Sequence, residues 1–125
     1  HDLDGTEIKQ IEKINKGVEY TKRAIEIIKD RYQDSDFLIG DISRELSLND
    51  SYLTAVFHKT TNRTPHEYLI DFRIQKSREY LETTDLSIAE IAEKVGYQNP
   101  LSFTRIFKSK MQLSPRVYVK KVKTK

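Results

Sequence analysis

The chain has 125 residues, which is the length of one domain or of one domain with a linker. Hydrophobic residues make up 37% and charged residues 33%, which excludes the disordered class, and no apolar run approaches the ~18 residues of a membrane span. The absence of cysteine excludes disulfides and cysteine-based metal sites, so together with the lack of a secretory signal the composition predicts a cytoplasmic protein without membrane contact.

The net charge of +3 is unevenly distributed along the sequence. The last 25 residues contain eight Lys or Arg residues and no Asp or Glu. A basic end beside a near-neutral body indicates a polyanionic partner. For the final stretch, residues 120–125, a solvated and frayed tail is an equally good interpretation.

Apolar residues are spaced by three and four along the whole chain, which predicts helices and almost no strand. We interpret residues 1–17 as a linker helix or loose segment, and residues 18–32 as the first helix of the domain. Gly17 separates the two, because a glycine inside a helix costs roughly 1 kcal/mol relative to alanine. Isoleucines and valines between residues 11 and 28 also fit a short heptad seam, but packing of residues 18–28 on the domain core is the preferred interpretation.

Six further helices are predicted from their start signals. Asn49 and Asn99 are suited to N-cap positions, and Pro100 is tolerated at the first helical position. Residues 64–67 and 87–90 both have the capping-box pattern. The predicted helices are Ile42–Ser47 after an Asp41 cap, Asp50–Thr60, Pro65 to about Glu82, Ile88–Lys94, a helix that starts at Pro100, and Pro115–Tyr118. The expected fold class is therefore all-α, with about seven helices.

The sequence contains an internal repeat, in which residues 42–68 align with residues 91–118. The matched pairs are Ile42 with Ile91, Leu53 with Phe103, Phe57 with Phe107, Pro65 with Pro115, and Tyr68 with Tyr118. Each copy consists of a short helix, a turn with a small residue and a second helix of about ten residues, which is the helix-turn-helix pattern. Two copies joined by a long helix indicate a duplication rather than a solenoid.

The second helix of each copy has one apolar face and one polar face. Successive residues of a helix are rotated by about 100°, so each second helix has an apolar face, formed by residues 53, 56 and 57 or by residues 103, 106 and 107. The side chains on the opposite face are the ones that a DNA major groove would meet. The candidate base-facing residues are Ser51, Thr54, Ala55 and His58 in the first copy, and Leu101, Ser102, Thr104 and Arg105 in the second. The candidates for phosphate contacts are Lys59, Lys108, Arg116 and the helix N-terminus at Ile42.

These candidates differ in how much sequence information they can read. Arg105 is the best candidate for a bidentate contact to guanine, and a phosphate contact is its alternative role. Leu101 and Ala55 can contact only apolar groups, such as a thymine methyl. His58 has an alternative interpretation as a solvated surface histidine. We therefore expect the second copy to supply the more discriminating contact.

The sequence provides no pattern for catalysis. It has no glycine-rich phosphate loop and no paired histidines at metal-binding spacing, and its carboxylates are scattered over polar helix faces. We expect no enzyme, no metal site and no cofactor. The alternative to DNA binding is a helical protein–protein interaction module, because a helix-turn-helix can also dock proteins.

The stretch SIAEIAEKVGYQNPLSFTRIFKSKMQLSPRVYVKK, residues 87–121, resembles the signature of the DNA-binding domain of AraC/XylS-type bacterial transcriptional activators. Its matching elements are Ile-Ala, then Val-Gly-aromatic, then Phe-x-Arg-x-Phe-Lys, then Ser-Pro-x-x-Tyr. The resemblance extends over about residues 18–121. The chain departs from the family at Asn62 and Gln112, where a glycine usually follows each recognition helix, and at Ser77, which replaces the usual alanine of the linker helix.

The resemblance implies two helix-turn-helix subdomains, residues 18–64 and 84–125, joined by a linker helix at residues 65–83. It further implies binding of double-stranded DNA in successive major grooves and regulation, in particular activation, of bacterial transcription, with RNA polymerase as a partner. Residues 1–17 are then expected to be the tail of a linker from an N-terminal sensing or receiver domain. A dimer formed through that missing domain is left open.

Overall fold

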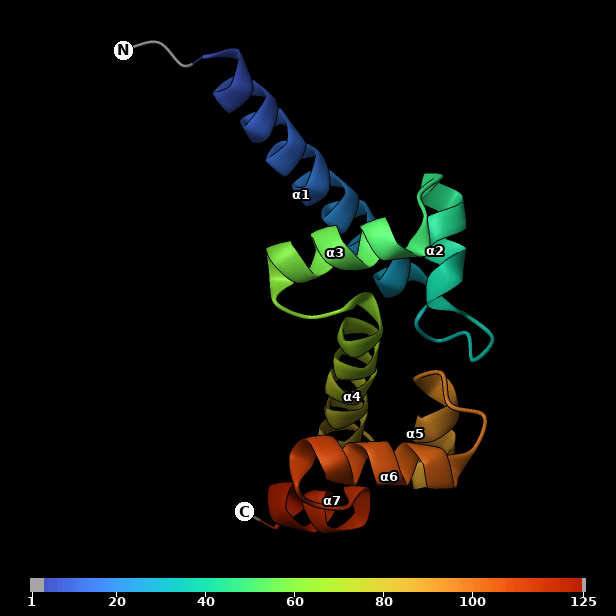
Figure 1. Cartoon of the computed structure of the whole chain (residues 1–125). Helices are drawn as coiled ribbons and strands as arrows, with labels where there is room; N and C mark the ends of the chain where they lie inside the picture. The colour runs from blue at the N-terminus through green and yellow to red at the C-terminus, as the bar shows by residue number, and fades with distance from the viewer. Residues whose placement is uncertain (1–3, 125) are drawn as a thin grey trace. The chain divides into compact units, whose positions relative to one another are not determined.

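The computed structural model describes residues 4–124, which form seven helices and no strand (Figure 1). The helices are α1 (Gly5–Arg31), α2 (Ile39–Leu46), α3 (Asp50–Thr61), α4 (Pro65–Thr83), α5 (Ile88–Lys94), α6 (Pro100–Met111) and α7 (Pro115–Lys123). The expectation of an all-α fold with about seven helices is confirmed for this part of the chain. None of the described helices is long and apolar enough to cross a membrane.

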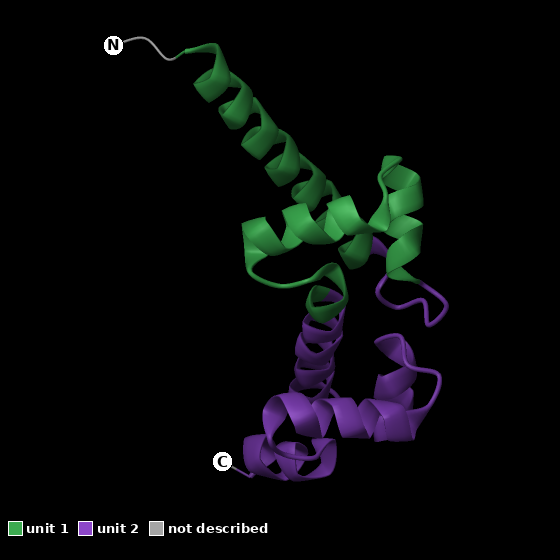
Figure 2. Cartoon of the chain, in the orientation of Figure 1, with its two compact units in different colours: residues 1–29, 38–68 green, residues 30–37, 69–125 purple. Residues whose placement is uncertain are grey.

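The chain divides into two compact units, coloured separately in Figure 2. Unit 1 consists of residues 1–29 and 38–68, and unit 2 consists of residues 30–37 and 69–125. Helix α4 begins in unit 1 and continues into unit 2. These bounds differ from the subdomains expected from the sequence, because most of α4 and the loop at residues 30–37 pack with the second helix-turn-helix.

Unit 1 is a three-helix arrangement of α1, α2 and α3 around a small apolar core. Ala24 and Ile28 of α1, Ile42 of α2, and Leu53 and Phe57 of α3 have no exposed surface. The period of the apolar residues places one face of each helix inward, and burial of these side chains stabilises the unit at roughly 25 cal/mol per Å² of apolar area.

Helix α1 runs without interruption through Gly17, so the expected division between a linker segment and a domain helix at this residue was wrong. Gly17 is buried, and a Cβ at this position would lie 3.3 Å from both Cβ and Cγ1 of Val56. The glycine therefore allows α1 and α3 to approach closely. This packing compensates for the low helix propensity of glycine.

The start of α2 also differs from the prediction. The helix begins at Ile39 and not at Ile42, and Asp41 is its third residue rather than its N-cap. The Asp41 Oδ2 atom accepts a hydrogen bond of 2.9 Å from the backbone N–H of Leu38, and the Asp41 N–H donates to the Leu38 carbonyl. The carboxylate satisfies a backbone donor from inside the first turn, so a cap side chain at residue 38 is not required.

The other predicted helix starts are confirmed. Asn49 Oδ1 accepts from the Tyr52 N–H at 2.7 Å, and Asn99 Oδ1 accepts from the Leu101 N–H at 2.8 Å. Both capping boxes form with reciprocal hydrogen bonds, between Thr64 and Glu67 and between Ser87 and Glu90. Helix α7 starts at Pro115 as predicted, but it continues to Lys123 and is longer than expected.

Unit 2 has its core between α4, α5, α6 and α7. Leu81, Ile91, Phe103 and Phe107 are fully buried or nearly so, and the Phe107 ring contacts the Tyr118 ring at a centroid distance of 5.5 Å. The Tyr118 hydroxyl donates to Glu82 Oε2 at 3.0 Å, which attaches α7 to the end of α4. The longer α7 is thus held by packing that the local sequence does not reveal.

A buried arginine explains why the loop at residues 30–37 belongs to unit 2. Arg73 Nε donates to the Tyr32 carbonyl at 2.9 Å, and its Nη2 atom donates to the Asp34 carbonyl at 3.1 Å. The Tyr32 ring also contacts the Phe72 ring edge-on at 4.9 Å. These contacts hold the loop against α4.

Helices α3 and α6 end with the non-glycine residues Asn62 and Gln112 in the left-handed conformation, which leads to a first prediction. Gln112 has a φ of 63°, its N–H donates to the Lys108 carbonyl, and its Nε2 donates to the Ser109 carbonyl at 3.0 Å. The Gln112→Gly variant is expected to unfold at higher urea concentration than the unmodified chain. Its free energy of unfolding should rise by about 0.5–1 kcal/mol, because glycine adopts this conformation without steric cost. Gln112→Ala is the matched control, since it loses the same side-chain bond without gaining this freedom, and an equal or greater stability of the alanine variant would contradict the account.

Candidate nucleic-acid interface

The two helix-turn-helix copies have the same turn geometry. In the first copy, Ser47 has a φ of 58°, and the Leu48 N–H donates to the Ser43 carbonyl at 2.9 Å. In the second copy, Gly96 has a φ of 99°, and the Tyr97 N–H donates to the Ala92 carbonyl at 2.9 Å. The repeat seen in the sequence is therefore a repeat of structure, with α2–α3 as one helix-turn-helix and α5–α6 as the other.

Helix α3 is held in unit 1 by its apolar face. Leu53 and Phe57 are fully buried, and the Phe57 ring contacts the Tyr68 ring edge-on at 5.5 Å. The four candidate base-facing residues of this copy lie on the exposed side, and all of them are solvent-exposed: Ser51, Thr54, Ala55 and His58. Their accessibility is what a major-groove contact requires, and the contact itself stays a prediction.

Helix α6 is organised in the same way in unit 2. Phe103 and Phe107 are fully buried, with their ring centroids 5.7 Å apart. Leu101, Ser102 and Arg105 are exposed, and Thr104 is half-buried. Leu101 is 67% exposed, so this leucine contributes little to the core of its own unit. The exposed face of α6 thus presents an apolar residue and a guanidinium one helical turn apart.

The candidate phosphate contacts divide into three that are accessible and one that is not. Lys59, Lys108 and Arg116 are exposed. The prediction of a phosphate contact at Ile42 was wrong, because Ile42 is fully buried and lies one turn inside α2. The actual start of α2 also carries the carboxylate of Asp41, which disfavours an anion at that helix end.

The charged group nearest the turn between α5 and α6 is the guanidinium of Arg73, a residue that is 8% exposed. Its guanidinium lies 5.3 Å from the centre of the Tyr97 ring. Burial lowers the pKa of Arg73, and the neighbouring Tyr97 opposes this effect, while burial raises the pKa of the Tyr97 phenol. Arg73 therefore acts inside unit 2 as a structural cation, and it is not available to DNA.

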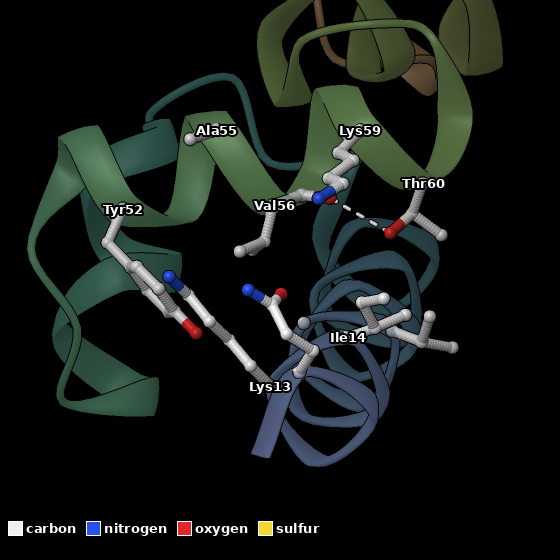
Figure 3. Close-up of a pocket in the computed structure, with 10 residues that line it drawn as sticks. Lys13, Ile14, Tyr52, Ala55, Val56, Lys59 and Thr60 are labelled. Carbon is white, nitrogen blue, oxygen red and sulfur yellow. Dashed lines mark hydrogen bonds between the residues drawn. The ribbon is translucent and has the colours of Figure 1, made fainter. Parts of the chain in front are cut away.

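A cavity of about 560 Å³ lies beside α3, between this helix and the N-terminal half of α1 (Figure 3). Its lining residues from α1 are Gln10, Lys13, Ile14, Gly17 and Val18, and those from α3 are Tyr52, Ala55, Val56, Lys59 and Thr60. The cavity includes Ala55 and Lys59, two of the predicted DNA contacts. Sequence reasoning missed the α1 residues because it treated residues 1–17 as a linker, although the helical period carried across Gly17 places Lys13 and Gly17 on one face.

Among residues 4–124, no group of three His, Cys, Asp or Glu side chains could hold a metal ion. The charged groups at the exposed faces of α3 and α6 are mainly cationic. Chemically, these faces can donate hydrogen bonds to bases and neutralise phosphates, and they supply no arrangement for bond-breaking chemistry.

Comparisons with known proteins agree with this geometry. A family model described as a helix-turn-helix domain matches residues 42–121. The Msm operon regulatory protein of Streptococcus mutans is 36% identical over 103 residues, which are 82% of this chain and 37% of the relative. The arabinose operon regulatory protein of Escherichia coli is 30% identical over 94 residues, which are 75% of this chain and 32% of that protein. The chain thus spans about a third of the length of these relatives.

One solved structure matches this chain over nearly the whole length of that structure. The C-terminal domain of the two-component response regulator yesN from Fusobacterium nucleatum is 34% identical to this chain, with a TM-score of 0.75. The similarity covers 77% of this chain and 93% of that structure. Apart from the first three residues of α2, both helix-turn-helix copies lie in the region matched by the family model.

Proposed function

Because the chain belongs to the AraC/XylS-type family of helix-turn-helix DNA-binding domains, we propose that α3 and α6 read one double-stranded DNA site together. The matching family model describes a helix-turn-helix domain, and the two operon regulatory proteins that match this chain are transcription regulators by name. The observation that carries the proposal is the exposed face of α6, where Leu101 and Arg105 are held outward by the buried Phe103 and Phe107. This is the arrangement in which a recognition helix presents side chains to base edges.

The two recognition helices enter successive major grooves in this proposal. Helix α4 has 19 residues, and at a rise of about 1.5 Å per residue it is about 28 Å long. Successive major grooves on one face of B-DNA recur about every 34 Å. A linker helix of this length supports a binding mode in which one chain contacts two adjacent subsites. A shorter spacing between the recognition helices would be accommodated by bending of the DNA, at a cost of a few kcal/mol.

The two helices contribute unequally to recognition. In α6, Arg105 contacts a guanine with two hydrogen bonds, Leu101 contacts an apolar group such as a thymine methyl, and Ser102 and Thr104 add weaker hydrogen bonds. In α3, Ser51, Thr54, Ala55 and His58 provide mainly fit and register. Lys59, Lys108 and Arg116 contact phosphates.

The whole protein activates transcription in this proposal, and RNA polymerase is its partner at the promoter. Two observations support this: the chain resembles AraC/XylS-type activators, and it is similar to about a third of the length of two operon regulatory proteins. In this proposal a sensing or receiver domain controls the DNA-binding domain. The protein works in the cytoplasm, where bacterial DNA is located.

Substitution of Arg105 tests the base contact. We expect Arg105→Ala to weaken binding to a selected site by about 1–3 kcal/mol and to relax the preference at one base pair. The measurement is a titration of selected and single-base-substituted duplexes by fluorescence anisotropy. Arg116→Ala is the comparison variant, because loss of a phosphate contact weakens binding uniformly across sequences. A uniform loss for Arg105→Ala as well would assign Arg105 to a phosphate.

A further inference from the structure

We propose that Lys13 of α1 and Lys59 of α3 together bind one DNA phosphate at the mouth of the cavity between these helices. The inference rests on the proposed function, and it adds α1 as a DNA-contacting element next to the first recognition helix. Both lysines line the cavity of about 560 Å³ in unit 1. In Figure 3, the Lys13 side chain extends from α1 toward Tyr52, and Lys59 extends from α3 on the opposite side of the cavity.

The chemistry of the cavity favours an anion at its mouth. Within residues 4–124, no carboxylate forms an ion pair with Lys13 or Lys59. A phosphate at the mouth of the cavity would be attracted by both ammonium groups. Ile14, Val18 and Val56 form an apolar floor on which the methylene chains of the lysines can lie while their charged ends stay in water.

The position of Lys13 is fixed by the packing of α1 on α3. One helical turn after Lys13, Gly17 meets Val56, where even a Cβ would be only 3.3 Å from the valine side chain. Thr21 Oγ1, a further turn along, lies 3.4 Å from the Val56 carbonyl and 3.4 Å from Thr60 Oγ1. The packing of α1 on α3 therefore holds the backbone of Lys13 beside the recognition helix.

The cavity is continuous with the predicted DNA-facing surface of α3. Ala55, a candidate base-facing residue, and Lys59, a candidate phosphate contact, are both part of its lining. Tyr52, whose ring packs edge-on against Tyr20 at 6.0 Å, also lines the cavity and offers a phenol hydroxyl. A duplex seated on the exposed face of α3 thus places a backbone phosphate near this mouth.

The second unit lacks this pair of lysines. In the repeat alignment, Lys59 corresponds to Ser109. The phosphate site is therefore specific to the first unit, where it adds affinity on the side that is expected to read fewer bases.

The test compares Lys13→Gln with Lys16→Gln in the full chain. Both residues are exposed and lie on α1, but Lys16 is outside the lining of the cavity, so it controls for the change in net charge. DNA affinity is measured between about 50 and 200 mM salt for a selected duplex and for an unrelated one. We expect Lys13→Gln to weaken both complexes by the same factor and to reduce the slope of log K against log salt by up to about one. Lys59→Gln is expected to behave like Lys13→Gln. In the double variant the slope of log K against log salt should still be reduced by only about one, because both lysines contact one phosphate.

The outcomes separate this inference from the proposed function. If the unmodified chain binds DNA but Lys13→Gln and Lys16→Gln have the same slope and affinity, the phosphate site is rejected and the DNA-binding function stands. A slope reduced by about two in the double variant would also reject a shared phosphate. If the unmodified chain does not bind DNA at all, the proposed function itself fails.

Discussion

Replacement of Gly96 by alanine is expected to lower the free energy of unfolding by on the order of 4 kcal/mol. Gly96 forms the turn of the second helix-turn-helix with a φ of 99°, which is unfavourable for any residue with a Cβ. In addition, a Cβ at this position would lie 2.2 Å from the Tyr32 carbonyl oxygen and 2.8 Å from Arg73 Nε. The strained backbone and the steric clash therefore both lower the free energy of unfolding of the variant.

The surroundings of Gly96 have little freedom to relax. The Tyr32 oxygen is backbone, and it accepts the hydrogen bond from Arg73 Nε at 2.9 Å. Moving either group would break this bond and leave a buried guanidinium with one acceptor fewer, which is costly. The loop at residues 30–37 would then lose its attachment to α4, so the substitution affects more of unit 2 than the turn alone.

Urea-induced unfolding followed by circular dichroism measures this effect, and Gly40→Ala is the matched control. Gly40 lies in α2, where the nearest atom to an added Cβ is the flexible Arg44 Nη1 at 3.8 Å. The control is expected to be stabilised by up to about 1 kcal/mol, because alanine is the better helix former. A loss below about 1 kcal/mol for Gly96→Ala would show that the turn tolerates a side chain, contrary to its geometry.

The second large effect is expected for Phe107→Ala, which should destabilise the chain by about 3–5 kcal/mol. Phe107 has no exposed surface, and its ring contacts those of Phe103 at 5.7 Å and Tyr118 at 5.5 Å. Removing the ring leaves a cavity between α6 and α7 and loses the aromatic contacts. Because these contacts seat α6, the remaining folded fraction should also bind a selected DNA site less tightly.

Phe107→Leu is the control for cavity size, since it retains most of the apolar volume and should cost clearly less than the alanine variant. Denaturant midpoints and slopes of all three proteins are compared, so that a change in the denatured state can be recognised from the slope. If Phe107→Ala and Phe107→Leu were equally stable, the ring cluster of Phe103, Phe107 and Tyr118 would not be a main source of stability in unit 2.

Local signals in the sequence predicted most of the fold. The caps at Asn49, Thr64, Ser87 and Asn99 act within four residues, so they can be read without knowledge of the tertiary structure. The prediction failed at α2, because Leu38 has no capping side chain and the carboxylate of Asp41 satisfies the first turn from inside. It also failed at Gly17, where a distant residue, Val56, decides that a glycine belongs in a continuous helix.

The candidate site was predictable to a similar degree. The exposed faces of α3 and α6 follow from the helical period and the repeat, so residues such as Ser51 and Arg105 were found in the sequence alone. Ile42 was misplaced because the start of its helix was misplaced. Arg73 was missed because its role arises from contacts across 39 or more residues of sequence, with the carbonyls of the loop at residues 30–37. Lys13 was missed because the cavity that it lines is formed together with α3, which is equally distant in the sequence.

The salt dependence of DNA affinity shows most directly whether this duplicated helix-turn-helix binds DNA through its two recognition helices. Each neutralised phosphate contributes about −0.9 to the slope of log K against log salt. With Lys13 and Lys59 sharing one phosphate, and Lys108 and Arg116 contacting one each, we expect a linear slope of about −3 for a duplex that carries both subsites. A slope near zero, or no binding even at about 50 mM salt, would contradict it and favour a helical module that binds proteins.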